Sequence, residues 1–344
     1  MSTQPGKRVV VTGATGNVGT SVVAALAEDP RVGSVLGLAR RLPQWSPPRT
    51  EWAQADVEKD GDRAFTAHFD GADAVIHLAW AFQPTHDPLA TWRTNVLGSL
   101  RVFRAAAAAR VPALVYASSV GAYSPGPKDR PVDESWPTHG WPEAAYCREK
   151  AYLERVLDAF EPRNPAMRVV RLRTAFLFKE TSASEQLRIF AGRLVPGRLA
   201  SPKVVPAVPD IEGLLFQALH TDDAADGYRR AALGDGVHGA FNLAADPPVG
   251  ARELAALLDA RVVHLPRLAA RTALAAAWTL HLVPSSPQLF DAFLRLPLMD
   301  CTRAHNELDW RPRYSALDAL QELLHGLREG AGMATPPMVG RGVA

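Results

Sequence analysis

The stretch Arg8-Val-Val-Val-Thr-Gly-Ala-Thr-Gly-Asn-Val-Gly19 decides the fold of this chain. Its β-branched start predicts a buried strand, and residues 18–27 predict a helix because Val22, Val23 and Leu26 fall on one side. The three glycines between them allow a tight turn and a close approach of the backbone to a pyrophosphate. Phosphate would sit at the helix N-terminus, where free N–H groups and the dipole favour anions. The stretch therefore predicts a phosphate-binding strand, turn and helix.

The same alternation continues through the N-terminal half. Residues 32–39, 72–79 and 113–118 predict further strands, and helical stretches lie between them, notably 95–110. Alternating strands and helices predict an α/β fold with a parallel, doubly wound sheet. Open sheets of this kind bind ligands at the carboxyl ends of their strands. The residues at these ends, which we expect to converge on one cleft, are Gly13, Ala39, Ala79 and Ser118.

Further along, the run Ala145-Tyr-Cys-Arg-Glu-Lys150 places a tyrosine and a lysine four residues apart. Residues four apart share a helix face, so the ammonium group of Lys150 can lie beside the phenol of Tyr146. A free tyrosine ionises near pH 10, and a nearby cation helps it exchange a proton near neutrality. The spacing alone is weak evidence. Downstream of the glycine turn, it indicates a dinucleotide-dependent redox enzyme.

Six landmarks occur in order over residues 8 to 150. They are the turn Thr12 to Gly19, the pair Asp56-Val57, the strand end His77-Leu78-Ala79, the segment Thr94-Asn-Val-Leu-Gly98, Ser118-Ser119 ahead of Tyr123, and Tyr146-Cys-Arg-Glu-Lys150. In this order they resemble the extended short-chain dehydrogenase/reductases, the group often called NAD-dependent epimerase/dehydratase-like. From about residue 175 onward the resemblance is only general.

The resemblance implies a role for each catalytic position. Tyr146 would pass a proton to or from the substrate oxygen, and Lys150 would lower its pKa and hydrogen-bond the nicotinamide ribose. Ser119 would hold the substrate oxygen; counting back from Tyr123 favours it over Ser118. Asn95 would be a structural or water-holding group in the catalytic region. The cofactor would carry the hydride.

The resemblance also implies a set of cofactor contacts. In addition to Tyr146 and Lys150, they are Gly13, Thr15, Gly16, Asn17, Val18, Gly19, Arg40, Arg41, Asp56, Val57, Leu78 and Ala79. Cys147 follows Tyr146 on the helix, so we expect it to point elsewhere and assign it no catalytic role.

The choice of cofactor depends on the end of the second strand. NAD-preferring sites place an acidic residue there, whereas NADP sites use arginine to bind the 2′-phosphate. Here Ala39 takes the acidic position, and Arg40 and Arg41 follow. Guanidinium groups make bidentate hydrogen bonds to phosphate. The sequence therefore predicts NADP(H) in preference to NAD(H), the alternative being that both arginines only decorate a loop before Pro43.

The segment Leu172-Arg-Thr-Ala-Phe-Leu-Phe-Lys-Glu180 departs from the family pattern. Sugar-nucleotide enzymes of this family carry an asparagine where Phe176 stands, and a phenyl ring cannot donate to a diphosphate. Aromatic residues also fall in expected active-site loops, and such residues line pockets for apolar ligands or simply anchor loops. The pocket residues that we predict are Trp80, Phe82, Ser119, Trp141 and Phe176.

We therefore expect an NAD(P)-dependent oxidoreductase that acts on a small, fairly apolar carbonyl or alcohol. One alternative is an epimerase or dehydratase that acts on a sugar nucleotide with a tightly held NAD⁺. A second is a non-catalytic, NADP-binding redox sensor, although such relatives commonly lack the tyrosine or lysine.

The chain is expected to form two lobes. Residues 1–174, completed by 216–245, would form the Rossmann domain, and 175–215 and 246–330 the substrate lobe. The small residues after Gly330 predict a mobile tail over 331–344. The apolar stretch 268–283 has 16 residues and includes Arg271 and His281, whereas a membrane span needs about 20 residues. We interpret it as a buried or lid helix, with membrane contact as the alternative, and expect no integral span.

Composition limits the partners. The 38 basic residues nearly balance the 36 acidic ones, so the net charge of +2 gives no indication of nucleic-acid binding. Two cysteines, Cys147 and Cys301, are too few for a disulfide framework and are typical of a cytoplasmic protein. The histidines lack metal-ligand spacing, so no metal is expected. In the family that the chain resembles, helices such as 95–110 and 145–160 commonly build a homodimer interface.

Overall fold

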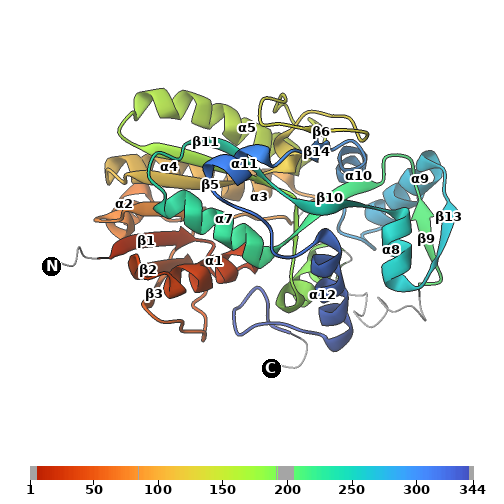
Figure 1. Ribbon diagram of the computed structural model, residues 1–344, viewed down its shortest axis with the longest axis horizontal. Coiled ribbons are helices and arrows are strands. Elements are labelled where there is room, and N and C mark those ends of the chain that lie inside the picture. Colours follow the sequence, from red (N-terminus) through yellow and green to blue (C-terminus); the bar gives the residue numbers. More distant parts are fainter. Residues whose placement is uncertain (1–5, 84, 191, 193–204, 341–344) are drawn as a thin grey trace.

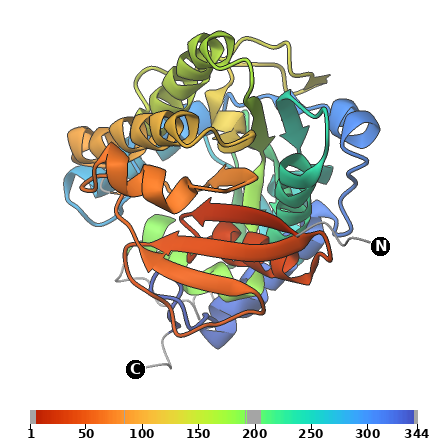
Figure 2. The same ribbon diagram turned by 90° about the vertical axis from the view of Figure 1, so that its left-hand side faces the viewer.

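The computed structural model describes residues 6–83, 85–190, 192 and 205–340. A seven-stranded parallel sheet lies at its centre, in the order β11-β7-β5-β4-β1-β2-β3 (Figures 1 and 2). The strands are β1 (Lys7–Thr12), β2 (Val32–Ala39), β3 (Thr50–Gln54), β4 (Ala74–His77), β5 (Ala113–Ser119), β7 (Arg168–Thr174) and β11 (Gly239–Leu243). The strand order reverses between β1 and β4, which opens a crevice at their carboxyl ends. The predicted doubly wound α/β fold is confirmed, and the short polar edge strand β3 is an addition to it.

Helices cover both faces of the sheet. One face packs on α1 (Asn17–Glu28) and α7 (Thr221–Leu233), and the other on α2 (Asp62–Phe69), α4 (Gly98–Ala108) and α5 (Ala145–Phe160) (Figure 1). In β1 the side chains alternate between the two cores: Val9 and Val11 lie in the first, and Val10 in the second. Burial on both faces explains why these strands are continuous apolar runs rather than alternating ones.

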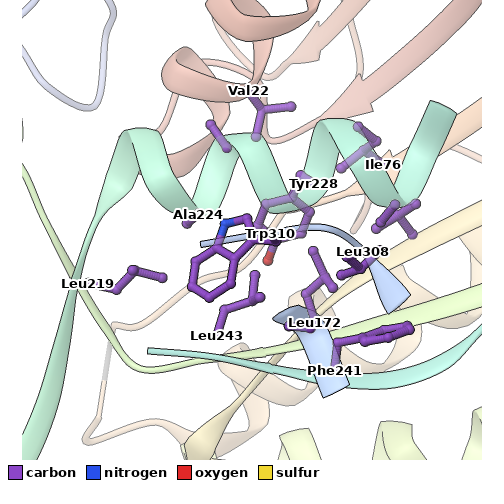
Figure 3. Packing of buried hydrophobic residues seen from close by; sticks show 14 of the residues in the cluster. Val22, Ile76, Leu172, Leu219, Ala224, Tyr228, Phe241, Leu243, Leu308 and Trp310 are labelled. Carbon is purple, nitrogen blue, oxygen red and sulfur yellow. The ribbon is translucent and has the colours of Figure 1, made fainter. Parts of the chain in front are cut away.

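The C-terminal third returns to the first of these cores. Trp310 is fully buried beside Tyr228, Ala224 and Leu243 (Figure 3), and its indole N–H donates to the carbonyl of Asp223 at 2.8 Å. It follows α11 (Thr302–Glu307) and precedes α12 (Ala316–Glu329). This part of the expected substrate lobe therefore contributes to the nucleotide-binding core.

The smaller lobe is built from the remaining elements, most of them at the right of Figure 1. They are β8 (Phe176–Phe178), β10 (Leu215–His220) and β12 (Ala245–Gly250) in one sheet, β9 (Ala207–Asp210) paired with β13 (Arg261–His264), β6 (Pro131–Val132) paired with β14 (Leu298–Met299), and the helices α6 (Ala183–Phe190), α8 (Ala251–Leu258), α9 (Arg267–Thr279) and α10 (Pro287–Phe293). Helix α3 (Pro88–Trp92) instead packs against α5 and leads toward α4. Strand β10 thus pairs with β8 and β12 rather than joining the main sheet. The apolar stretch at 268–283 forms α9, and none of the described helices is long and apolar enough to cross a membrane.

Residues 331–340 differ from the mobile tail that the sequence predicts. Thr335 and Met338 are fully buried, and Ser184 of α6 donates to the carbonyl of Ala331 at 2.7 Å. Arg188, also on α6, donates to the carbonyls of Pro337 and Val339. The described part of this segment is therefore a packed strap that holds α6, because its carbonyl groups accept hydrogen bonds that composition cannot reveal.

Candidate active site

The glycine turn leads from β1 into α1 in a conformation that side chains would block at two positions. Gly13 has a φ of +68°, and a Cβ there would lie 2.7 Å from the backbone nitrogen of Ala79. At Gly19 a Cβ would lie 2.2 Å from the carbonyl oxygen of Gly13. At Gly16, in contrast, it would meet nothing closer than that same oxygen, at 3.5 Å. Two glycines thus let the turn pack, and the third leaves its outer side open to a ligand.

The N-terminus of α1 is suited to an anion. Gly16 is the N-cap residue and offers no side-chain hydrogen bond, and the first turn of the helix carries no acidic residue. The first N–H groups of a helix have no partners within it. Asn17 is oriented by its side chain, which donates to the carbonyl of Leu177 at 3.1 Å and accepts from Thr221 at 3.1 Å. These features fit the diphosphate of a dinucleotide.

A cleft of about 330 Å³ opens on this turn, and we call it the cofactor cleft. Of the expected cofactor contacts, those that line it are Gly13, Thr15, Gly16, Asn17, Val18, Gly19, Arg40, Arg41, Val57, Leu78 and Ala79. Asp56, Tyr146 and Lys150 are not among them. The Asp56 carboxylate accepts from the backbone N–H of Glu58 at 3.0 Å and so shapes the loop behind Val57. The sequence did not indicate Glu185, Gln186 and Ile189 of α6, or Pro336 and Pro337 of the strap, which also line the cleft.

His77, at the end of β4, joins the elements that form the base of this crevice. Its ring nitrogens hydrogen-bond the hydroxyls of Thr12 at 2.7 Å and Ser99 at 2.8 Å, which ties β4 to β1 and α4. Burial lowers the pKa of His77 to about 3, and the Lys150 charge acts in the same direction. The ring is therefore neutral and has a structural role.

Ser119 and Tyr146 lie together at the end of β5. Burial raises the pKa of the Tyr146 phenol, and its hydrogen bond with Ser119 acts in the opposite direction. The two serines face different surroundings, since Ser118 donates to Glu154 at 2.5 Å and takes no part in this contact. Gly121 makes room for the tyrosine, because a Cβ there would lie 2.7 Å from its ring. This geometry supports Ser119 as the residue that holds the substrate oxygen.

Lys150 lies one turn after Tyr146 on α5, but its closest contacts are with other groups. Its ammonium donates to the carbonyl of Ala117 at 2.6 Å and lies 3.5 Å from the ring centroid of Trp80, compared with 5.9 Å from that of Tyr146. Burial lowers the pKa of Lys150 to about 7, although Glu149 and Glu154 favour its charged form. Part of its positive charge is therefore lost near neutral pH.

Asn95 is completely buried, and its side chain makes three hydrogen bonds. Its side chain accepts from the N–H of Ala81 at 2.7 Å and donates to the carbonyl of Ala81 at 2.8 Å and to Glu149 at 2.7 Å. These bonds fix the loop after β4 against α5. They support the structural role for Asn95 rather than direct contact with a substrate.

A second, apolar cavity of about 510 Å³ adjoins the cofactor cleft. Both are lined by Asn17, Val18, Phe82, Gln186 and Ile189, so the two spaces meet there. The other lining residues are Ser119, Val120, Gly121, Tyr146, Cys147, Thr174, Ala175, Phe176, Leu177, Phe178, Phe190, Phe216, Leu274, Ser285, Leu289, Phe290, Ala292, Phe293 and Leu296. Among the described residues that line this cavity, none carries a charge.

Phe82, Ser119 and Phe176 of the predicted pocket line this cavity. Trp80 instead lies beneath the Lys150 ammonium, and its ring meets that of Tyr146 edge to face at 5.7 Å. Trp141 is not among the lining residues; it packs in a small cluster with Tyr146 and Cys147, and under the guanidinium of Arg295.

Cys147 differs from the expectation that it points elsewhere, because it lines the cavity. Burial raises the pKa of its thiol to about 12, so it stays protonated and has no nucleophilic character. The sequence also missed the phenylalanines of α6, β10 and α10, whose convergence depends on packing between segments far apart in the chain. Leu274 of α9 completes the wall, which supports the interpretation of this helix as a lid.

Residues 9–244 match the family described as the NAD dependent epimerase/dehydratase family. An uncharacterized protein of Mycobacterium tuberculosis is 25% identical, over 93% of this chain and 84% of its own length. An L-arabinose 1-dehydrogenase (NAD(P)(+)) of Haloferax volcanii is 37% identical over 33% of this chain and 41% of its own. The Thermus thermophilus UDP-glucose 4-epimerase, solved as a complex with NAD, has the same fold, with a TM-score of 0.69 at 18% identity over 93% and 99% of the two chains.

The match covers well over half of the chain and includes the glycine turn, Ser119, Tyr146 and Lys150. It agrees with the order of the landmarks in the sequence, of which the glycine turn, Val57, Leu78 and Ala79 line the cleft. This chain belongs to the NAD dependent epimerase/dehydratase family.

Proposed function

We propose that this protein is an NAD(P)-dependent oxidoreductase that reduces the carbonyl group of an apolar substrate, or oxidises the corresponding alcohol. The observation that carries the proposal is the uncharged, phenylalanine-lined cavity of about 510 Å³ beside Ser119 and Tyr146. A cavity of this volume and lining is typical of sites for apolar small molecules with a few polar groups for orientation. Its volume accommodates a larger molecule than the small substrate expected from the sequence.

In the proposed reaction Ser119 and Tyr146 bind the substrate oxygen, and Tyr146 gives it a proton during reduction or removes one during oxidation. Burial raises the pKa of the phenol, so Tyr146 is protonated in the free protein and ready to donate. Lys150, one helical turn away, would bind the ribose and stabilise the phenolate that the donation leaves. When bound in the cleft, the nicotinamide cofactor supplies or accepts the hydride.

The apolar lining also argues against a sugar nucleotide. A diphosphate needs cationic or N–H donors, and leaving its charge unpaired in an apolar site costs several kcal/mol. Phe176 packs edge to face against Phe216 at 5.5 Å and Phe293 at 5.3 Å, so the position where an asparagine would serve a diphosphate belongs to an aromatic cluster. Epimerase chemistry remains the second candidate, supported by the shared fold of the UDP-glucose 4-epimerase complex.

For the cofactor we propose a preference for NADP(H) over NAD(H). Ala39 ends β2 without a carboxylate, and the exposed Arg40 and Arg41 line the cleft beside it. Two guanidinium groups can bind a 2′-phosphate, which NAD lacks. Replacing both arginines with alanine should weaken NADPH binding and leave NADH binding unchanged; an equal loss for the two cofactors would contradict the preference.

The first experiment identifies any nucleotide that co-purifies with the protein and then compares substrates. We expect reversible binding of NADPH and its oxidation in the presence of lipophilic ketones or aldehydes, with no turnover of UDP-sugars. A retained NAD⁺ together with interconversion of UDP-sugars would reject the oxidoreductase in favour of the epimerase.

A further inference from the structure

Glu185 of α6 brings a carboxyl group into the cofactor cleft. It lines the cleft together with Gly13, Gly16 and Asn17, the residues that would hold the diphosphate. One of its oxygens, Oε2, is buried and has no hydrogen-bond partner in the described part of the chain. A buried acceptor without a partner costs free energy, so this oxygen needs an explanation.

The carboxyl group interacts with the same backbone that would bind the cofactor. Burial raises the pKa of Glu185 to about 7. The backbone N–H of Asn17, in the first turn of α1, acts in the opposite direction and favours the ionised form. The group can therefore carry a proton under ordinary conditions, unlike an exposed glutamate.

The cations around Glu185 do not neutralise it through direct contact. Arg188, one turn further along α6, donates to the carbonyls of Pro337 and Val339. Lys179 donates to the hydroxyls of Thr20 at 2.7 Å and Ser21 at 3.0 Å. Both charges lower the pKa of Glu185 from a distance only. The charged residues that line the cleft are Arg40, Arg41 and Glu185. Among the described residues, Glu185 is therefore the one acidic group of the cleft.

Helix α6 is also held in place. Ser184, the residue before Glu185, donates to the carbonyl of Ala331 at 2.7 Å, and the strap residues Pro336 and Pro337 line the cleft on the same side. The carboxyl group is therefore presented to the diphosphate position by two fixed elements rather than by a free surface loop.

We propose that Glu185 is a proton-carrying contact of the cofactor diphosphate. As the neutral acid it donates its O–H to a diphosphate oxygen, and as the carboxylate it repels that oxygen and competes for the N–H of Asn17. Cofactor binding above the titration of Glu185 therefore takes up one proton. This inference rests on cofactor binding at the glycine turn and is independent of the substrate that the apolar cavity accepts.

The test is the pH dependence of cofactor affinity from pH 6 to 9, with NADPH and NADH as probes and no substrate present. Calorimetric titrations in buffers of different ionisation enthalpy measure the protons taken up. In the wild-type protein the affinity should fall above about pH 7 by up to about tenfold per pH unit, the limit for one linked proton. In Glu185→Gln the amide keeps a donor without the charge, so the affinity at pH 8.5 should rise at least several-fold and the linked proton should disappear.

Glu180→Gln is the matched control. Glu180 lies five residues before Glu185, has a half-exposed side chain 3.8 Å from His325, and does not line the cleft. It should keep the wild-type pH profile. Lys150 also titrates near pH 7, so only the component of the pH dependence that Glu185→Gln removes is assigned to Glu185.

Three results would overturn the proposal. They are a wild-type protein that takes up no proton on binding at pH 8.5, a Glu185→Gln protein with the wild-type pH profile, and a folded protein that binds neither cofactor at pH 6. The first needs no variant, so the proposal stays testable even if Glu185→Gln folds poorly. Failure to turn over any apolar carbonyl would reject the proposed function and leave this inference intact.

Discussion

The cofactor cleft and the apolar cavity meet at Asn17 and Phe82, yet they are built in different ways. The phosphate-binding side of the cleft is formed by backbone and small residues of one contiguous segment, the turn from Gly13 to Gly19. The cavity is formed by large side chains from many separate segments, among them Phe176, Phe216 and Phe293. Phosphate binding in the cleft therefore depends on backbone geometry and the cavity on side-chain identity, so a mutation should affect one without the other.

The largest effect is expected at Tyr146, the proposed proton donor, which lines the apolar cavity. Tyr146→Phe removes the phenolic proton and keeps the ring that packs on Phe82 at 4.7 Å. We expect turnover to fall by roughly 10²- to 10⁴-fold, the usual range for a general acid or base. Cofactor affinity should change little. Steady-state kinetics and fluorescence titration with NADPH measure the two quantities, and near-normal turnover would remove Tyr146 as the proton donor.

The contrast between a contiguous turn and a cavity of distant side chains also explains which site residues the sequence predicts. The glycine turn can be predicted from the sequence because one contiguous segment contains the strand, the turn and the helix. Ser119, Tyr146 and Lys150 can be predicted as site residues because their order follows the family pattern. In these cases a local segment predicts the residue types and the strand or helix that carries them, and their chemistry stays a prediction.

Residues that depend on distant packing were not predictable. Phe216 and Phe293 reach the cavity from β10 and α10, and Glu185 reaches the cleft from α6, with no local motif to mark any of them. Trp141 lies in the loop just before Tyr146, but it packs against Arg295 and does not line the cavity. Loop position alone therefore does not decide where a side chain points.

A substitution at Gly16 should impair cofactor binding in the cleft and leave the apolar cavity unchanged. Gly16→Val places a side chain on the open side of the turn, where even a Cβ meets no protein atom closer than 3.5 Å. The fold should tolerate it, whereas the pyrophosphate should be excluded, with cofactor affinity reduced by about 100-fold or more, equivalent to roughly 3 kcal/mol. Thermal unfolding checks the first expectation and fluorescence titration the second. A large loss of stability with unchanged affinity would reverse the interpretation of Gly16.

A substitution at Phe176 should impair substrate binding in the apolar cavity and leave the cofactor cleft unchanged. Phe176→Asn restores the polar residue of the sugar-nucleotide pattern and removes a ring that packs on Phe216 and Phe293. Because an apolar substrate loses buried contact, kcat/KM for a lipophilic ketone should fall by about 10- to 100-fold, equivalent to roughly 1.5–3 kcal/mol. Cofactor affinity should stay unchanged. Phe178→Leu, an apolar change in the same strand, is the control and should have a smaller effect; improved turnover in Phe176→Asn would contradict the apolar-substrate proposal.

The last prediction concerns the pH-dependent contribution of Lys150 to stability, which is at most about 1.4 kcal/mol per pH unit. Burial lowers its pKa to about 7 from the ordinary value of 10.5, so between these values the unfolded chain binds more protons than the folded one. The free energy of unfolding should therefore rise with pH across this window, by at most about 1.4 kcal/mol per pH unit from this group. Lys150→Met lacks the titrating group, so the difference in stability between wild type and variant should shift in favour of the wild type from pH 7 to pH 10. Urea unfolding of both proteins at several pH values measures it, and parallel stability curves would show that Lys150 titrates at its ordinary pKa and that its ammonium is well solvated rather than enclosed by Trp80 and the carbonyl of Ala117.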